Sequence, residues 1–309
     1  MPYDTPQNLT SAETTGFNND KPMFLVQQAN NPSEAHWTTT GNLSGTDVTL
    51  PAEPAFRAYD DFGNLVTSTT GVASTSPKYF GFTFTTAITF DALLITGHNF
   101  ASTALTSVSL EIADDAAFGT NKIEIAKWTR GSATVDDRIL ITNLNSAGGS
   151  STYDANGTAQ RYSGVEHARI VVTHSGSKDP ELGEIFLGRR YQLQRNPDVP
   201  FDNKNQASLV ADFSSNSGMT KRYVLNRGQS IRSFTATISD SDEITVIDNW
   251  YAAINEGTRN FVYIETPSSG AKAYIMLLDD SALNFPLVGP FERVLQFGMT
   301  EQPPFLARE

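Results

Sequence analysis

The chain has 309 residues, 39% of them apolar, and a formal net charge of −12 at pH 7. This acidity opposes nucleic acid or an anionic membrane as the main partner, because both attract clustered Lys and Arg. The sequence contains no cysteine, which excludes thiolate catalysis, cysteine-based zinc sites and iron–sulfur clusters.

The first segment, residues 1–77, is predicted to form an extended N-terminal arm and the start of the first domain. It is polar, and residues 23–26 (Met-Phe-Leu-Val) are its one convincing strand. Residues 1–8 lack the basic stretch and apolar core of a signal peptide. Apolar runs stop at about five residues, too short for a membrane span. We therefore expect synthesis and assembly in the cytoplasm, without membrane insertion.

Residues 78–194 are predicted to form a β-sandwich. Apolar residues alternate with small or polar ones along short segments that end in Asp, Gly, Asn or Ser, a pattern typical of strands and turns. The predicted strands are 79–84, 88–96, 108–113, 123–126, 138–141, 167–173 and 184–192. No helical pattern separates them, which favours a sandwich over an α/β fold.

A second domain, residues 195–309, is predicted to follow. Two prolines within residues 195–202 and a change in composition mark the boundary. The predicted strands are 207–213, 221–226, 230–238, 259–265, 272–279 and 291–298. The chain ends in an extended tail, because the prolines at 303 and 304 cannot donate ladder hydrogen bonds. The predicted fold class is all-β with one helix.

That helix is predicted near residues 243–256. Ile244, Ile247, Tyr251 and Ile254 form an apolar stripe at helical spacing, with Trp250 beside it. Asp240 and Glu243 have the spacing of a capping box, and Gly257 supplies a stop. We expect the stripe to pack against the sheet of the second domain.

No constellation of residues points to catalysis, so we predict no catalytic residue and no enzyme activity. The four histidines lack metal-ligand spacing, and no nucleophile elbow or phosphate loop occurs. The loop 114–121 offers oxygen ligands suited to calcium, from Asp114, Asp115 and Asn121. The alternative is a strand-connecting loop whose side chains bond to their own backbone. No other cofactor is expected.

The first half resembles the discoidin, or galactose-binding-like, jelly roll. The matching segments are 90–100, 108–115, 168–172 and 182–188, where an Ala-Arg pair on one strand is followed by Gly-Glu-Ile on the next. The resemblance covers residues 78–194. It implies a jelly-roll sandwich, and members of that family bind sugars or lipids through loops at one end.

The whole chain looks like the minor tail and tail-tip proteins of long-tailed bacteriophages. The matching pieces include 95–100, 183–188, 232–235, 257–262 and 274–277. This resemblance implies that residues 195–309 adopt a tail-tube-like β fold and close into a homo-oligomeric ring, expected to be a hexamer. The protein would then be a structural distal tail or adaptor protein of the tail tip or baseplate. Tail tube and hub proteins would be its partners, and the jelly roll would face outward toward a host-surface glycan.

The same resemblance places the chain in the virion tail, assembled in the host cytoplasm. We expect Pro303, Pro304 and Phe305 to contact neighbouring subunits, because an extended tail cannot bury itself alone. Three alternatives stay open. They are a carbohydrate-binding module protein, a phage head-decoration or neck protein, and a glycan hydrolase, for which no carboxylate stands out.

Overall fold

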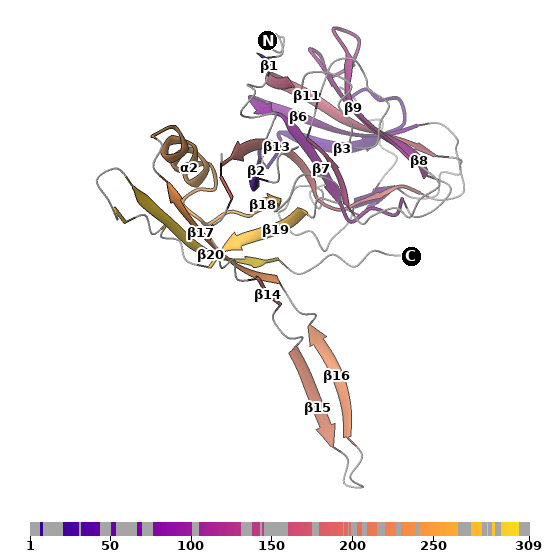
Figure 1. The fold of residues 1–309 in the computed structure, drawn as a ribbon. Helices are drawn as coiled ribbons and strands as arrows, with labels where there is room; N and C mark the ends of the chain where they lie inside the picture. The colour runs from indigo at the N-terminus through magenta and orange to yellow at the C-terminus, as the bar shows by residue number, and fades with distance from the viewer. Residues whose placement is uncertain are drawn as a thin grey trace.

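The computed structural model describes residues 7–8, 21–30, 32–43, 51–53, 67–69, 77–100, 105–130, 138–142, 144, 160–174, 179–193, 195–196, 198, 203–205, 209–214, 220–226, 230–238, 241–264, 273–279, 283, 286–287 and 292–302. Within these residues the chain is mainly β with a single α-helix, which confirms the predicted fold class (Figure 1). Pro303, Pro304 and Phe305 lie outside them, so their role in subunit contacts stays a prediction.

Two antiparallel sheets form the predicted sandwich in the first half of the chain (Figure 1). The first sheet has the order β3-β6-β11-β8-β9, with β1 beside β11. Its strands are β1 (Gln7–Asn8), β3 (Glu34–Thr38), β6 (Lys78–Phe90), β8 (Leu105–Ala113), β9 (Ile123–Thr129) and β11 (Gln160–His174). Facing it are β10 (Arg138–Ile141), β7 (Ala92–Thr96) and β13 (Ile185–Gln192), which belong to a larger sheet.

Both faces of the larger sheet are apolar where it meets the sandwich. Successive side chains of a strand point to opposite faces. In β7, Leu93 and Ile95 therefore enter the sandwich core, while Leu94 joins a second cluster on the far face. All three side chains are fully buried. This explains why the segment reads as an uninterrupted apolar run rather than as alternating apolar and polar residues.

The larger sheet runs through both halves of the chain, in the order β10-β7-β13-β2-β18-β19-β20-β17-β14. Its further strands are β2 (Met23–Gln27), β14 (Asn203–Asn205), β17 (Ser230–Ile238), β18 (Phe261–Ile264), β19 (Ala273–Leu278) and β20 (Arg293–Glu301). β2, which the sequence analysis placed in the segment 1–77, lies between β13 and β18. Strands from both sides of the boundary expected at 195–202 therefore pair within this one sheet.

The helix α2 (Ser241–Ala253) lies against one face of the larger sheet (Figure 1). The predicted apolar stripe is confirmed: Ile247, Trp250 and Ile254 are fully buried in one cluster, with Ile244 and Tyr251 packed at its border. The helix starts and ends slightly earlier than the predicted 243–256. Left-handed backbone angles at Asn255, Glu256 and Gly257 turn the chain away after it. No helix of the described residues is long and apolar enough to cross a membrane.

Several strands of the structure have no counterpart in the sequence analysis. They are β1, β3, β14 and the three-stranded sheet β12-β5-β4, formed by β12 (Glu181–Leu182), β5 (Thr67–Thr69) and β4 (Pro51–Glu53). Most are short and polar, so they lack the alternation that marks a strand in the sequence. β11 also begins seven residues before the predicted start at 167. Its pairing with β6 shifts register between Tyr162 and Val165, which breaks the pattern there.

Candidate functional site

The most distinctive feature of the molecule is a two-stranded hairpin that leaves its body. β15 (Leu209–Ser214) pairs antiparallel with β16 (Thr220–Asn226), and these two strands form a separate sheet. Figure 1 shows them pointing away from both large sheets, beyond the edge strand β14. We call β15 and β16 together the arm. The sequence predicts strands at 207–213 and 221–226, but not that they leave the body.

The arm continues a ribbon that begins at the edge of the larger sheet. Asn203 of β14 pairs with Arg232 of β17. Leu209 lies six residues after Asn203 and pairs with Asn226, which lies six residues before Arg232. The β14–β17 pair and the first residue pair of β15 and β16 are therefore in the same register. Beyond Leu209 the register shifts once before the arm continues. The strands that enter and leave the arm are thus held by the sheet itself.

The sequence of the arm and its base is basic, whereas the rest of the chain is acidic. Residues 203–227 carry four basic residues, Lys204, Lys221, Arg222 and Arg227, and a single acidic one, Asp212. This segment therefore has a net charge of +3. The other residues together carry −15, which gives the net charge of −12 for the whole chain. This positive segment in an acidic chain is a signal in the sequence, but it is shared with β13, which carries Arg189 and Arg190 and no acidic residue. Opposite charge favours association of this segment with acidic surfaces.

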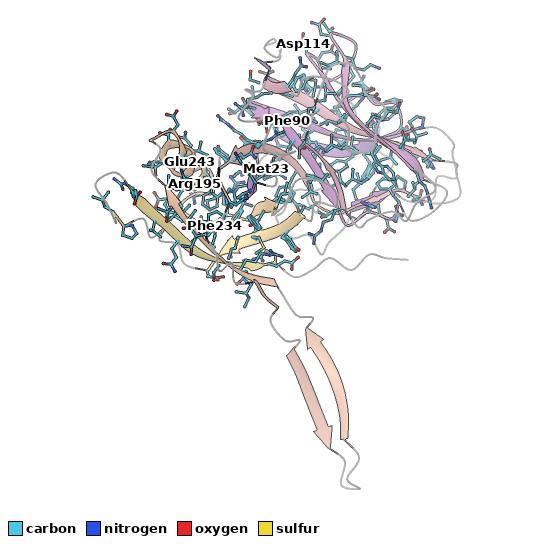
Figure 2. The ribbon with its side chains drawn as sticks, in the orientation of Figure 1. Met23, Phe90, Asp114, Arg195, Phe234 and Glu243 are labelled. Atoms are coloured by element: carbon cyan, nitrogen blue, oxygen red, sulfur yellow. The ribbon has the colours of Figure 1, made fainter. Side chains whose placement is uncertain are left out.

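A partly buried ion pair between Arg195 and Glu243 holds α2 near β17. The Arg195 Nε donates to the Glu243 carboxylate at 2.8 Å, and another guanidinium nitrogen donates to the carbonyl of Thr237 on β17. Glu243 is buried, and Figure 2 shows it beside Arg195. Glu243, predicted as part of a capping box, thus binds the segment that follows β13. Asp240, the other member of that box, lies outside the described residues.

The calcium candidates lie in the loop between β8 and β9. Asp115 accepts hydrogen bonds from the backbone amides of Ala117 at 2.9 Å, Gly119 at 3.1 Å and Thr120 at 2.5 Å. Hydrogen bonding from Thr120 and its neighbours lowers the pKa of the Asp115 carboxyl below its usual value. The Asn121 side-chain nitrogen donates to Asp114 at 2.6 Å. This is the loop-bonded arrangement that the sequence offers as the alternative to a calcium site, and melting curves with and without calcium distinguish the two.

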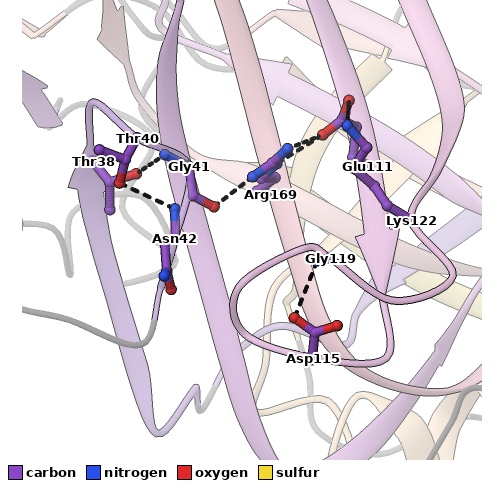
Figure 3. A network of polar contacts seen from close by, with 9 residues as sticks. All are labelled: Thr38, Thr40, Gly41, Asn42, Glu111, Asp115, Gly119, Lys122 and Arg169. Carbon is purple, nitrogen blue, oxygen red and sulfur yellow. Dashed lines mark hydrogen bonds and ion pairs between the residues drawn. The ribbon is translucent and has the colours of Figure 1, made fainter.

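A cluster centred on the Arg169 side chain lies beside this loop and joins β11 to four other segments of the sandwich (Figure 3). Arg169 on β11 donates to Glu111 on β8 at 2.7 Å and to the carbonyl of Gly41. Its guanidinium also covers the rings of Phe118 at 4.0 Å and Tyr79 at 4.5 Å. Gly41 has a φ of +78°, and a Cβ there would clash with the guanidinium. The cluster therefore holds two loops against the outer face of the first sheet.

His98 is a buried histidine whose pKa departs from its usual value. It is buried at the end of β7, and its Nδ1 accepts the Phe100 amide hydrogen at 3.2 Å. Burial lowers its pKa from 6.5 to about 4, so the ring is neutral at pH 7. In the part of the chain that the structure describes, no three His, Asp or Glu side chains gather in a way that could hold a metal ion.

Comparison with solved structures finds carbohydrate-binding modules with a similar arrangement of strands. A family 32 module of NanJ from C. perfringens, solved with galactose, is 13% identical, with a TM-score of 0.33 over 54% of this chain and 98% of the module. Chitosan-binding module 1 from a chitosanase/glucanase of Paenibacillus sp. IK-5 is 16% identical, with a TM-score of 0.34 over 53% and 98%. A putative chitobiase fragment from Bacteroides thetaiotaomicron is 13% identical, with a TM-score of 0.33 over 56% and 95%.

These likenesses concern the fold alone. None of the three is a bacteriophage protein. No protein-family model matches the chain, and no curated protein does so either. The likeness of residues 195–309 to the tail-tube fold stays a prediction.

Proposed function

We propose that this chain is a structural subunit of a larger protein assembly, which it joins through the arm. The observation that carries this proposal is the arm itself, a two-stranded sheet standing outside the body (Figure 1). A lone two-stranded hairpin is at best marginally stable in water, and three or more strands or a packed helix are needed for independent stability. A partner that packs against the arm supplies this missing stabilisation.

The edges of the arm offer further support. Within the described residues, β15 and β16 pair with one another and with no third strand. The outer edge of each strand then presents backbone N–H and C=O groups that another chain can pair with. The base of the arm is fixed by the pairing of β14 with β17. A base paired into a large sheet, continued by strands with unpaired outer edges, is the arrangement expected of a docking element.

We propose more finely that the assembly is the tail tip of a long-tailed bacteriophage. The support is the sequence resemblance described above together with the arm. In this proposal the chain forms a homo-oligomeric ring in the virion tail, joins the tail tube to hub proteins, and is assembled in the host cytoplasm. Within the same structural class, a head-decoration or neck protein is the alternative position.

The test uses a variant without the arm. Asn205 pairs with Ser230, so replacing residues 206–229 by Asn-Gly closes the ribbon as a two-residue hairpin. We expect this variant to keep the melting temperature of the full chain and a mainly β circular dichroism spectrum, because it loses only the two strands of the arm. We expect it to be absent from assembled particles, whereas gold-labelled antibody marks the full chain at one tail end. Equal incorporation of the two proteins contradicts the proposal.

The second candidate function is carbohydrate binding by the sandwich. One of the similar modules was solved in complex with galactose and another is named a chitosan-binding module, and the first half of the sequence resembles the galactose-binding-like family. A glycan array probed with the full chain separates the two functions. Sugar binding retained by the variant without the arm supports a carbohydrate-binding module. Silence on the array combined with loss of assembly in that variant supports the structural role.

A further inference from the structure

We propose that residues 23–29, which we call the strap, fix the sandwich and the second half of the chain as one rigid body. This inference goes beyond the proposed function and does not depend on it. In the larger sheet, the described strands β10, β7 and β13 of the first half reach β18, β19, β20 and β17 of the second half only through β2. Figure 1 shows β2 between the sandwich and β18. Without the strap, the larger sheet would separate into two.

The strap contributes side chains to three hydrophobic clusters. Ala29 belongs to the core of the sandwich. Phe24 and Val26 belong to the cluster beneath α2, and Met23 and Leu25 to the cluster on the far face of the larger sheet. All five side chains are at most 1% exposed. Opening the strap would expose apolar surface in all three clusters, and the hydrophobic effect opposes this.

Gln27 anchors the strap to both halves. Its side-chain Oε1 accepts the backbone amide hydrogen of Leu187 at 2.9 Å, and its Nε2 donates to the carbonyl of Ile185 at 2.5 Å. β2 ends at Gln27, which pairs with Gly188, so the side-chain amide continues the ladder along β13 past the last paired residue. From the other side, the Arg259 Nη2 donates to the Gln27 carbonyl at 3.4 Å. The buried Gln27 therefore contacts the sandwich and the second half together.

The segment that leads from the sandwich into the second half is also held in place. Leu193 directly follows β13 and is fully buried in the cluster beneath α2. Arg195 binds Glu243 of the helix. The backbone amide of Asp198 donates to the carbonyl of Thr235 on β17 at 2.7 Å. A hinge needs residues that can absorb large changes in backbone angles, and these contacts oppose such changes in the described part of the segment.

The larger sheet curls, so that its outer parts meet. β10 is first and β20 seventh in the strand order, and six strand spacings would be about 29 Å in a flat sheet. Yet Arg138 of β10 lies 3.4 Å from Glu301 of β20, and its guanidinium lies 6.0 Å from the ring centroid of Tyr274 on β19. Leu140 and Ile275, from the same two parts, share one buried cluster. β2 is thus the middle strand of a sheet whose outer strands also contact one another.

The consequence is a fixed orientation of the sandwich relative to the base of the arm. The strand β14, from which the arm continues, belongs to the same sheet as the strap and β13. A surface on the sandwich is then presented at one angle to the base of the arm in every copy of the chain.

The first experiment measures distances between spin labels in the full chain. The sequence has no cysteine, so labels attach only where cysteines are introduced. Thr129→Cys on β9 and Asn249→Cys on α2 place exposed labels on the two halves. The control pair, Glu34→Cys with Thr129→Cys, lies within the sandwich. We expect one narrow distance distribution across the halves, as narrow as that of the control. A broad or two-peaked distribution for the first pair alone would overturn the proposal.

The second experiment measures backbone amide hydrogen exchange in the unaltered chain. If the strap opens only together with the halves, the amides of β2 exchange within about tenfold of the slowest amides of β8 and β17, because one cooperative unit shares one opening free energy. Much faster exchange in β2, while β8 and β17 stay protected, would show that the strap opens alone. That result would also overturn the proposal.

Gln27→Leu tests the anchor, and Gln28→Leu is the matched control. The Gln28 side chain donates to the carbonyls of Val26 and Gln27, within the strap itself. Gln27→Leu leaves the Leu187 amide and the Ile185 carbonyl without this partner, so we expect the amides of β2 to exchange at least tenfold faster than in the full chain. The control should stay within threefold.

Equal exchange of β2 in Gln27→Leu and in the full chain would show that packing alone holds the strap, and would overturn the role of Gln27. Circular dichroism shows whether Gln27→Leu folds. If it does not fold, the spin-label distances and the exchange of the unaltered chain still decide the proposal. None of these measurements involves assembled particles, so their outcome is independent of the proposed function.

Discussion

Phe24 lies opposite Tyr263 across the pair formed by β2 and β18, with their ring centroids 5.6 Å apart. Phe24 also contacts Trp250 of the helix at 4.6 Å and Phe234 of β17 at 5.8 Å. A residue from the start of the chain is thus the centre of the aromatic core that the C-terminal half builds. Its neighbour Leu25 belongs to the cluster on the other face of the sheet, with residues of both halves.

We predict that Phe24→Ala destabilises both halves together. Removing a fully buried ring costs about 3–5 kcal/mol of unfolding free energy, and the shared sheet transmits the loss. Denaturant unfolding followed by tryptophan fluorescence reads both regions, because Trp37 and Trp128 lie in the sandwich core and Trp250 on the helix. Phe24→Leu is the control and should cost less. Two separate transitions, with only the Trp250 signal shifted, would contradict this prediction.

We predict that Arg169→Lys destabilises the sandwich although it keeps the positive charge. Lysine cannot reproduce the planar contacts with Phe118 and Tyr79 or the paired hydrogen bonds to Glu111. Both partners of this ion pair are largely buried, so the expected loss is about 2–3 kcal/mol. Urea denaturation measures it. Lys122→Ala, which removes an exposed partner of Glu111 at 4.0 Å, should change stability by less than about 0.5 kcal/mol.

We predict that stability falls as the pH decreases from about 6.5 to about 4, with His98 as one cause. The folded protein keeps this ring neutral, whereas the unfolded chain protonates it near pH 6.5, so unfolding takes up a proton in this window. The contribution reaches about 3 kcal/mol at the acid end. His98→Asn retains an acceptor for the Phe100 amide but does not titrate, so its melting temperature should depend less on pH. An unchanged pH profile in this variant counts against the assignment.

Calcium is expected to leave the melting temperature unchanged. The oxygens of Asp115 already accept backbone amide hydrogens, and an N–H directed at a carboxylate occupies the position that a cation would take. Melting curves with calcium and with a chelator measure this. A calcium-dependent rise that disappears in Asp115→Asn would establish the calcium site that the sequence analysis considered.

Much of the local structure follows from the sequence. The alternation in 108–113 and 230–238 predicts β8 and β17, and the stripe from Ile247 to Ile254 predicts the helix. These patterns depend on neighbouring residues and on the geometry of one element, so they need no knowledge of partners. The basic segment around Lys221 and Arg222 was equally present in the sequence, but charge by itself does not show that a strand leaves the body.

The sequence by itself determined that this chain is a mainly β protein with one helix that buries an apolar face. Only the tertiary structure decided that β2 joins both halves in one sheet and that the arm stands apart from it. The physical reason is that strands pair through backbone N–H and C=O groups, which every residue except proline carries alike. Side-chain pattern therefore specifies which face of a strand is buried, whereas the neighbour of that strand is set by how all the faces pack together.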